Sequence, residues 1–133
     1  MSHITRVRTT LRDAHLLAAA LKEAGYPYVQ VHDNPVPMRD SAGQPRRMEV
    51  IVQPTPLYGG LPGIRFARSR DGSFEAIMDT GLKRRFGSQL LPRITQAYGH
   101  AAALKYAQDH GYEVVTDESE TDGTRRLTLR RYA

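Results

Sequence analysis

Two segments of the chain share one pattern, in which an amphipathic helix runs into a Gly-Tyr pair and then into a hydrophobic strand. The first helix covers residues 16–24 and ends at Gly25, and the second covers residues 94–110 and ends at Gly111. Glycine readily adopts the left-handed conformation that terminates a helix, so each strand starts at once and lies beside its helix. We therefore expect a two-layer α+β sandwich, with both units in one sheet-plus-helices layer pair.

The remaining segments complete this set of elements. Asp13 is the predicted N-cap of the first helix and Ser88 that of the second, while Asp71-Gly72 supplies the tight turn of a hairpin. The predicted order is β-α-β-β-β-β-α-β-β, a mostly antiparallel sheet with two helices on one face. The strands are expected at residues 4–10, 29–31, 48–52, 64–69, 74–79, 112–116 and 126–130.

The stretch from residue 33 to residue 47 interrupts the pattern. It contains three prolines, a glycine and a serine without periodicity, so we expect a long irregular excursion. The strand that follows alternates, with Met48, Val50 and Val52 on one face and Ile51 on the other. We expect residues 33–47 to be the least ordered segment of the chain.

Length and composition limit the class of protein. A chain of 133 residues is expected to form a single domain over residues 1–133, with one hydrophobic core. Cysteine is absent, which excludes disulfides, thiolate metal sites and cysteine nucleophiles. No run of about 18 apolar residues is present, and the N-terminal residues lack the apolar region of a signal peptide. We expect a cytoplasmic protein that does not enter a membrane.

The chain is basic, with a formal net charge of +5, and its basic side chains are mostly arginine. Arginine suits bidentate binding of carboxylate or phosphate, which favours an anionic partner. A composition bias of the genome toward arginine explains the same excess, because a high pI by itself only weakly implies nucleic acid.

No constellation of catalytic or metal-ligating residues can be recognised. The spacing of the histidines matches no helical metal pair or zinc motif, so we interpret them as surface or capping residues. A site that gathers His3 and His32 with Asp33 or Asp79 is the alternative. The acidic residues at 117–123 are expected to form a solvated turn. We predict no catalytic residue, no metal and no cofactor, and hence a non-enzymatic protein. The histidines are His3, His15, His32, His100 and His110.

A basic run before the second helix is the best candidate for an anion contact. Lys83, Arg84 and Arg85 lie between two glycines, where a phosphate would meet both the basic side chains and a helix N-terminus. The alternative is a solvated connector whose Phe86 inserts into the core. The glycine-rich residues 59–63 precede a strand rather than a helix, so they are interpreted as a turn.

Arginines on the first and last strands are the candidates for contact with a partner or with nucleic acid. Arg6 and Arg8 alternate along the first strand, and Arg126 and Arg130 along the last. They form one basic surface if these strands lie together. Aromatic residues that would stack bases are scarce on these strands, and a solvated face or a protected sheet edge explains the same pattern.

Several blocks of the chain resemble the conserved chloroplast and cyanobacterial reading-frame family number thirty-five, a domain of unknown function also found in bacteria. The similar blocks are the start of the chain with its Ser-His and basic strand, the hairpin, the Thr-Gln and Tyr signature of the second helix, the Gly-Tyr-Glu-Val strand and the Arg-Leu-Thr-Leu-Arg strand. These blocks are residues 1–9, 64–79, 91–98, 111–114 and 122–130.

The resemblance covers nearly the whole chain except residues 33–63, where the proline-rich excursion departs from the family pattern. It implies the same fold and localisation, and it supplies no catalytic or ligand-binding residue. Relatives of this kind suggest an AAA-type ATPase as a partner.

We therefore expect a small accessory or adapter protein that binds a larger protein assembly. A chain without a catalytic constellation, but with an irregular excursion and an arginine-rich sheet face, fits partner binding better than turnover. The alternative function is binding of RNA or another nucleic acid through the arginine-bearing strands. The sequence leaves the oligomeric state open.

Overall fold

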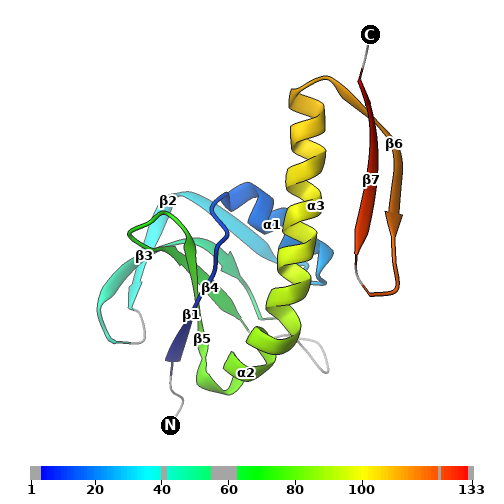
Figure 1. Ribbon diagram of the computed structural model, residues 1–133. Helices are drawn as coiled ribbons and strands as arrows, with labels where there is room; N and C mark the ends of the chain where they lie inside the picture. Colours follow the sequence, from blue (N-terminus) through cyan, green and yellow to red (C-terminus); the bar gives the residue numbers. More distant parts are fainter. Residues whose placement is uncertain (1–3, 40–41, 55–62, 123, 132–133) are drawn as a thin grey trace.

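The computed structural model describes residues 4–39, 42–54, 63–122 and 124–131, and its strands form two antiparallel sheets (Figure 1). The larger sheet has five strands in the order β1-β5-β4-β3-β2, and the smaller is the hairpin β6-β7. The predicted α+β class is confirmed. The strands are β1 (Ile4–Arg8), β2 (Val29–Arg39), β3 (Pro45–Val52), β4 (Ile64–Arg68), β5 (Phe74–Asp79), β6 (Tyr112–Ser119) and β7 (Arg125–Arg131).

The helices α1 (Ala14–Glu23) and α3 (Leu91–Asp109) pack on one face of the five-stranded sheet. Phe66 and Phe74 on the sheet meet Leu17 and Leu21 of α1 and Ile94 of α3 in the main core, where all five side chains are fully buried. Burial of this apolar surface is the principal contribution to stability, at about 25 cal/mol per Å² removed from water.

The first helix begins and ends as the sequence predicts. The Asp13 carboxylate accepts a hydrogen bond from the Leu16 amide at 2.9 Å, which satisfies an amide that the helix itself leaves without a partner. Gly25 has a φ of +109°, a left-handed conformation that costs little only for glycine. Tyr26 is then fully buried where the chain turns toward β2.

The segment expected to be an irregular excursion is a β-hairpin, so the prediction for residues 33–47 is wrong. β2 runs on to Arg39 and β3 begins at Pro45, with a register shift between Val31 and Val36 that accommodates the extra residues. Prolines are tolerated in β2 because it is an edge strand, where a missing amide need not break a ladder. A composition typical of loops therefore led to a wrong prediction for residues that extend β2.

A bulge in β3 also changes the predicted faces of that strand. The register with β4 shifts between Met48 and Val50, and the extra residue reverses the alternation at that point. Val50 and Val52 face the helices as predicted, whereas Met48 lies in a separate cluster next to Ile51.

The second helix begins earlier than predicted. A continuous helical run starts after Asp79, whose carboxylate accepts a hydrogen bond from the Gly81 amide at 2.8 Å. Ser88 is not an N-cap, because it lies inside this run and its hydroxyl donates to the Arg84 carbonyl at 2.8 Å. Phe86 is fully buried in the main core. The run consists of η1 (Thr80–Leu82), α2 (Lys83–Arg85), η2 (Phe86–Leu90), which is a π-helical turn, and α3.

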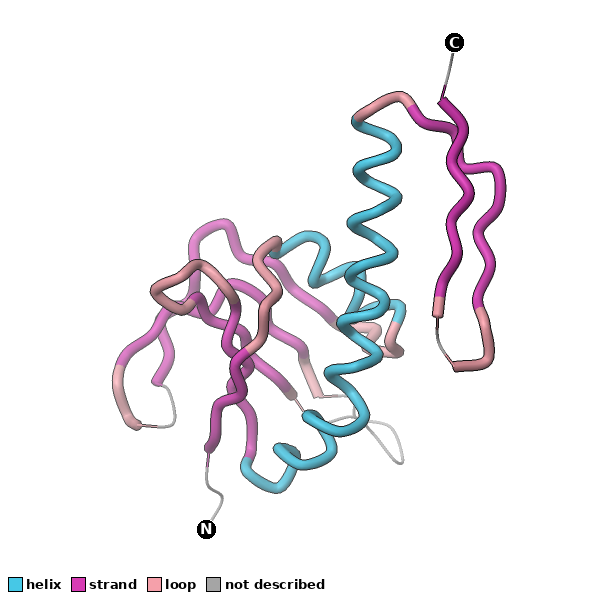
Figure 2. The backbone as a smooth tube through the Cα atoms, in the orientation of Figure 1, coloured by secondary structure: helices cyan, strands magenta, loops and turns pink. Residues whose placement is uncertain are grey.

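The second helix-Gly-Tyr-strand unit does not join the main sheet. Gly111, with a φ of +72°, ends α3 as predicted, but among the described strands β6 then pairs with β7 alone, and this hairpin packs against α3 away from the five-stranded sheet (Figures 1 and 2). The expectation of a single layer pair is therefore wrong for this unit. β6 also continues through Ser119, into the segment expected to be an acidic turn. The predicted glycine-rich turn at residues 59–63 lies outside the described residues, except for Gly63.

Candidate functional site

Among the described residues, helices cover one face of the five-stranded sheet, and the opposite face, here called the outer face, carries the candidate site. Successive side chains of a strand point to opposite faces, so the core position of Ala76 on β5 places Glu75 and Ile77 on the outer face. On the neighbouring β1, Val7 packs against the core, which directs Arg6 and Arg8 outward.

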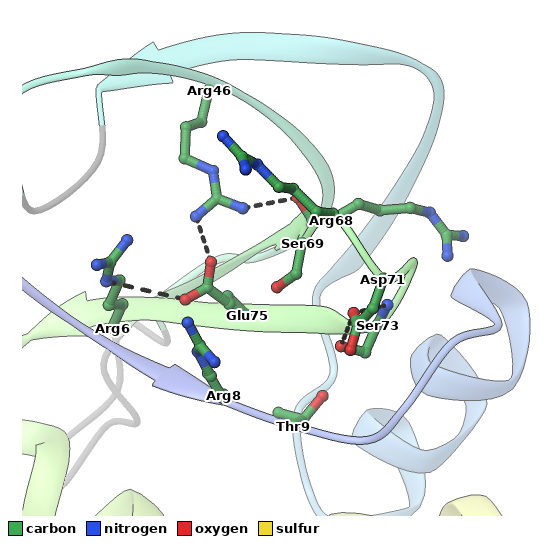
Figure 3. A pocket seen from close by; sticks show the side chains of 10 residues that line it. Arg6, Arg8, Thr9, Arg46, Arg68, Ser69, Asp71, Ser73 and Glu75 are labelled. Atoms are coloured by element: carbon green, nitrogen blue, oxygen red, sulfur yellow. Dashed lines mark hydrogen bonds and ion pairs between the residues drawn. The ribbon is translucent and has the colours of Figure 1, made fainter.

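Glu75 organises the arginines of the outer face (Figure 3). Its side chain is only 7% exposed, and its carboxylate lies 2.6 Å from Nη1 of Arg46 and 3.8 Å from Nε of Arg6. Arg46 belongs to β3 and spans β4 to reach this carboxylate, while its Nη2 donates to the Arg68 carbonyl at 2.7 Å. A buried carboxylate therefore holds guanidinium groups from two strands in one place.

Arg68 has a structural role at the edge of the site. Its guanidinium donates to both carboxylate oxygens of Glu49, at 2.8 and 3.2 Å, and to the carbonyls of Arg12 and Gly72. It also lies 4.4 Å from the centroid of the Phe74 ring. These contacts fix the β4-β5 turn to the start of α1, and they leave Arg68 little capacity for a ligand.

The β4-β5 turn closes one end of the site. The Asp71 carboxylate accepts hydrogen bonds from the Ser73 hydroxyl at 2.6 Å and the Ser73 amide at 2.9 Å. These two bonds, with smaller electrostatic effects of Arg12 and Arg8, hold the pKa of Asp71 below its ordinary value. Because the folded-state pKa is the lower one, this contribution to stability is complete at neutral pH and is lost as the pH falls through the acidic range.

Together these residues line a hollow of about 510 Å³, here called the basic pocket. Arg8 and Arg70 line it without an ion pair to any described residue. Figure 3 shows Arg6, Arg8 and Arg46 arranged around Glu75. The pocket thus contains five arginines and two carboxylates, an arrangement that attracts anions. Its lining is Arg6, Arg8, Thr9, Arg46, Arg68, Ser69, Arg70, Asp71, Ser73 and Glu75.

An apolar area adjoins the basic pocket on the same face. Met48 and Ile77 are fully buried there, although no helix of the described residues covers this face, and Met38 and Ile51 pack against them partly exposed. A second hollow of about 430 Å³, here called the apolar hollow, lies beside this cluster. Its lining includes Ile4, which is 41% exposed, together with Met38, Ile51 and Arg65.

The structure separates the four arginines predicted to contact a partner. Arg6 and Arg8 lie at the basic pocket, whereas Arg126 and Arg130 lie on β7 of the separate hairpin. The single basic surface proposed for them does not form, because the first and last strands belong to different sheets. Arg126 and Arg130 instead pair with acidic residues of the hairpin, Glu120 and Glu113 respectively.

The predicted anion contacts Lys83, Arg84 and Arg85 form the short helix α2. Their side chains are exposed, but the helical run continues through them into α3, so no free helix N-terminus follows them. The amide of Leu91, for example, already donates to the carbonyl of Phe86. The expected anion site combined these basic side chains with a helix N-terminus, and the helix N-terminus is not present at this position.

Sequence reasoning missed a polar network that attaches the hairpin to the helices. His100 on α3 has a side chain only 7% exposed, and its Nε2 lies 2.9 Å from a carboxylate oxygen of Asp117 on β6. Arg125 on β7 lies 3.0 Å from the same ring nitrogen, and its Nη1 donates to Glu23 at the end of α1 at 3.1 Å. The residues lie far apart along the chain, so no local motif indicates this contact.

Replacing Arg125 with alanine is expected to loosen the hairpin and leave the main core intact. The substitution removes contacts to three elements: hydrogen bonds to Glu23 and His100, each of about 1–3 kcal/mol before solvent screening, and a longer ion pair with Asp117 at 3.7 Å. Amide exchange in β6 and β7 should accelerate roughly tenfold, while exchange in β4 and β5 stays unchanged.

Arg126→Ala is the matched control, because the Arg126 side chain is 73% exposed and, among the described residues, forms an ion pair with Glu120 alone. It should leave hairpin exchange within about twofold of the parent protein. Equal acceleration in both variants would show that the network does not anchor the hairpin.

Within the described parts of the chain, no group of three potential ligand side chains is placed to hold a metal ion. No described helix has the length and apolar character required to cross a bilayer.

Comparison with known proteins identifies the family. A family described as "Protein of unknown function (DUF1257)" matches residues 20–128, which is most of the chain. The chain belongs to the DUF1257 family. It is also 22% identical to the "Uncharacterized protein ycf35" of Pyropia yezoensis over 134 residues, covering 99% of this chain and 98% of that protein. The predicted family resemblance is thus confirmed. No solved structure shows significant similarity to this DUF1257 protein.

Proposed function

We propose that this DUF1257 protein is a non-enzymatic adapter whose outer sheet face docks onto an acidic surface of a larger protein assembly. The observation that carries the proposal is the combination on one uncovered face of an apolar hollow and a basic pocket. Protein interfaces combine an apolar centre with polar contacts, and methionine and arginine are enriched in them. The positive charge of this face favours a partner surface rich in carboxylates.

The composition of the face favours a protein over a nucleic acid. Single-stranded nucleic acids are usually bound by aromatic side chains that stack on bases, beside a basic groove. None of the described residues that line the basic pocket or the apolar hollow is aromatic. Apolar side chains such as Ile4 and Ile51 provide instead a surface that a folded partner can bury.

The docking proposal is tested with a variant of the apolar hollow, Ile4→Asp combined with Arg65→Glu. Ile4 is exposed and Arg65 forms no ion pair with a described residue, so we expect the variant to fold. The parent protein, used as bait in an extract of its own host, should retain a recurring assembly that mass spectrometry identifies. The variant should retain at least about tenfold less of this assembly than the parent does, because it replaces an apolar contact and reverses a charge.

Lys105→Glu is the control for the charge reversal at Arg65, since Lys105 is exposed on α3, away from the outer face. It should retain the assembly. The AAA-type ATPase that the family resemblance suggests is then a named candidate among the retained proteins. Recovery of RNA without any recurring protein, or equal recovery by the double variant and the parent, would contradict the adapter function.

A further inference from the structure

We propose that the basic pocket binds the dianionic phosphate of a phosphate monoester. This inference goes beyond docking, because it assigns a ligand chemistry to a defined group of side chains at the β1, β3 and β5 part of the outer face. The assignment rests on the charge balance of the pocket, on the preorganisation of its arginines and on donor groups that no other described side chain engages.

The charge balance matches a dianion. Five arginines line the pocket against Asp71 and Glu75, and Glu49 occupies the guanidinium of Arg68 from outside. Two positive charges therefore remain without a carboxylate. A single carboxylate ligand would offset one of them, whereas a phosphate monoester carries a charge of nearly −2 at neutral pH and presents three acceptor oxygens.

The pocket holds its arginines in position in the absence of a ligand. Glu75 fixes Arg46 at 2.6 Å and attracts Arg6 at 3.8 Å, so the side-chain entropy of these long residues is partly lost already on folding. Arg8 stands opposite Glu75 in the register of β1 and β5 without pairing to it. Its guanidinium is therefore available for a bidentate contact to a phosphate.

Arg70 and Ser69 complete the set of donors. Both lie at the turn between β4 and β5 and line the pocket, and neither side chain is engaged by another described residue. Ser69 can donate its hydroxyl hydrogen to a phosphate oxygen, and Arg70 adds a second unpaired guanidinium. We thus expect β1 and the β4-β5 turn to contact the phosphate directly. Glu75 and Arg46 hold the surrounding side chains in position.

The test uses phenyl phosphate and a five-residue peptide, Ala-Gly-phosphoserine-Gly-Ala, which carries no other charged side chain. Binding to the full chain is followed by nitrogen-15 NMR, including the arginine Nε-H signals. Both probes should bind the parent protein. Affinity should fall roughly tenfold in Arg8→Ala and in Arg70→Ala, the effect of removing one charge-assisted hydrogen-bonding group. Lys105→Ala should bind like the parent.

The peptide also distinguishes the source of the phosphate. Tighter binding of the peptide than of phenyl phosphate assigns the pocket to a phosphorylated protein, whereas equal affinities assign it to a small phosphorylated molecule. Either result supports the site. Equal binding of a peptide with glutamate in place of phosphoserine, or an Arg8→Ala variant that binds as well as the parent, would overturn it, as would binding of oligonucleotides alone.

Failure of this inference is distinguishable from failure of the docking function. The variant Ile4→Asp with Arg65→Glu leaves Arg8, Arg70 and Ser69 in place, so it should still bind phenyl phosphate even where it no longer retains the assembly. Conversely, Arg8→Ala keeps the apolar hollow intact.

Discussion

Replacing Phe86 with alanine should lower the free energy of unfolding by about 3–5 kcal/mol, the largest effect that we expect from a single substitution. The Phe86 side chain is fully buried in the main core, between the helical run and the sheet. Its removal costs the transfer free energy of the ring and leaves a cavity that the surrounding structure fills only in part. Urea denaturation, followed by circular dichroism, measures the loss.

Two substitutions provide the comparison for Phe86→Ala. Phe86→Leu keeps most of the apolar volume and should cost clearly less, while Arg84→Ala removes an exposed side chain from the same run and should change stability by no more than about 0.5 kcal/mol. A loss below about 1 kcal/mol for Phe86→Ala would mean that the residue does not anchor the run to the core.

Replacing Glu75 with alanine should lower the free energy of unfolding by about 1–3 kcal/mol. The carboxylate is nearly inaccessible to water, and its loss leaves the guanidinium of Arg46, whose side chain is 16% exposed, without its charge partner. We place the effect below that of a fully buried pair, because the residual exposure of Arg46 lets water replace part of the contact.

The double variant Glu75→Ala with Arg46→Ala shows whether this loss comes from the pair. The changes in unfolding free energy caused by substituting two residues in direct contact are usually not additive. The double variant should therefore lose less stability than the sum of the two single losses. Strict additivity would show that the interaction between Glu75 and Arg46 contributes nothing to stability. Chemical denaturation at pH 7 is the measurement in all three cases.

The parts of the fold that could be predicted are those encoded by adjacent residues. Asp13 caps its helix through a hydrogen bond three residues away, and Gly25 and Gly111 end helices through their own backbone conformation. The hairpin at Asp71-Gly72 is equally local, with a φ of +88° at Gly72. Signals of this kind depend on steric and hydrogen-bonding preferences that act within a few residues.

The parts that could not be predicted depend on tertiary contacts. The prolines that predicted an irregular excursion are compatible with β2 because this strand lies at the edge of the sheet. A sequence does not show which strands become edge strands. The candidate site follows the same rule. Arg46, Arg8 and Glu75 come from strands that are adjacent only after folding, and His100 meets Arg125 only because the hairpin packs back on α3.

The pairing of β1 with β5 has a consequence for the synthesis of the chain. Residues 4–8 leave the ribosome well before their partner strand, Phe74–Asp79, and the Thr9 hydroxyl donates to the Phe74 carbonyl across 65 residues. At synthesis rates of about 5–20 residues per second, the nascent chain waits on the order of several seconds before this partner emerges. The sheet therefore closes on β1 only after β5 has been made, and two arginines of the basic pocket, Arg6 and Arg8, reach their positions only when that strand docks.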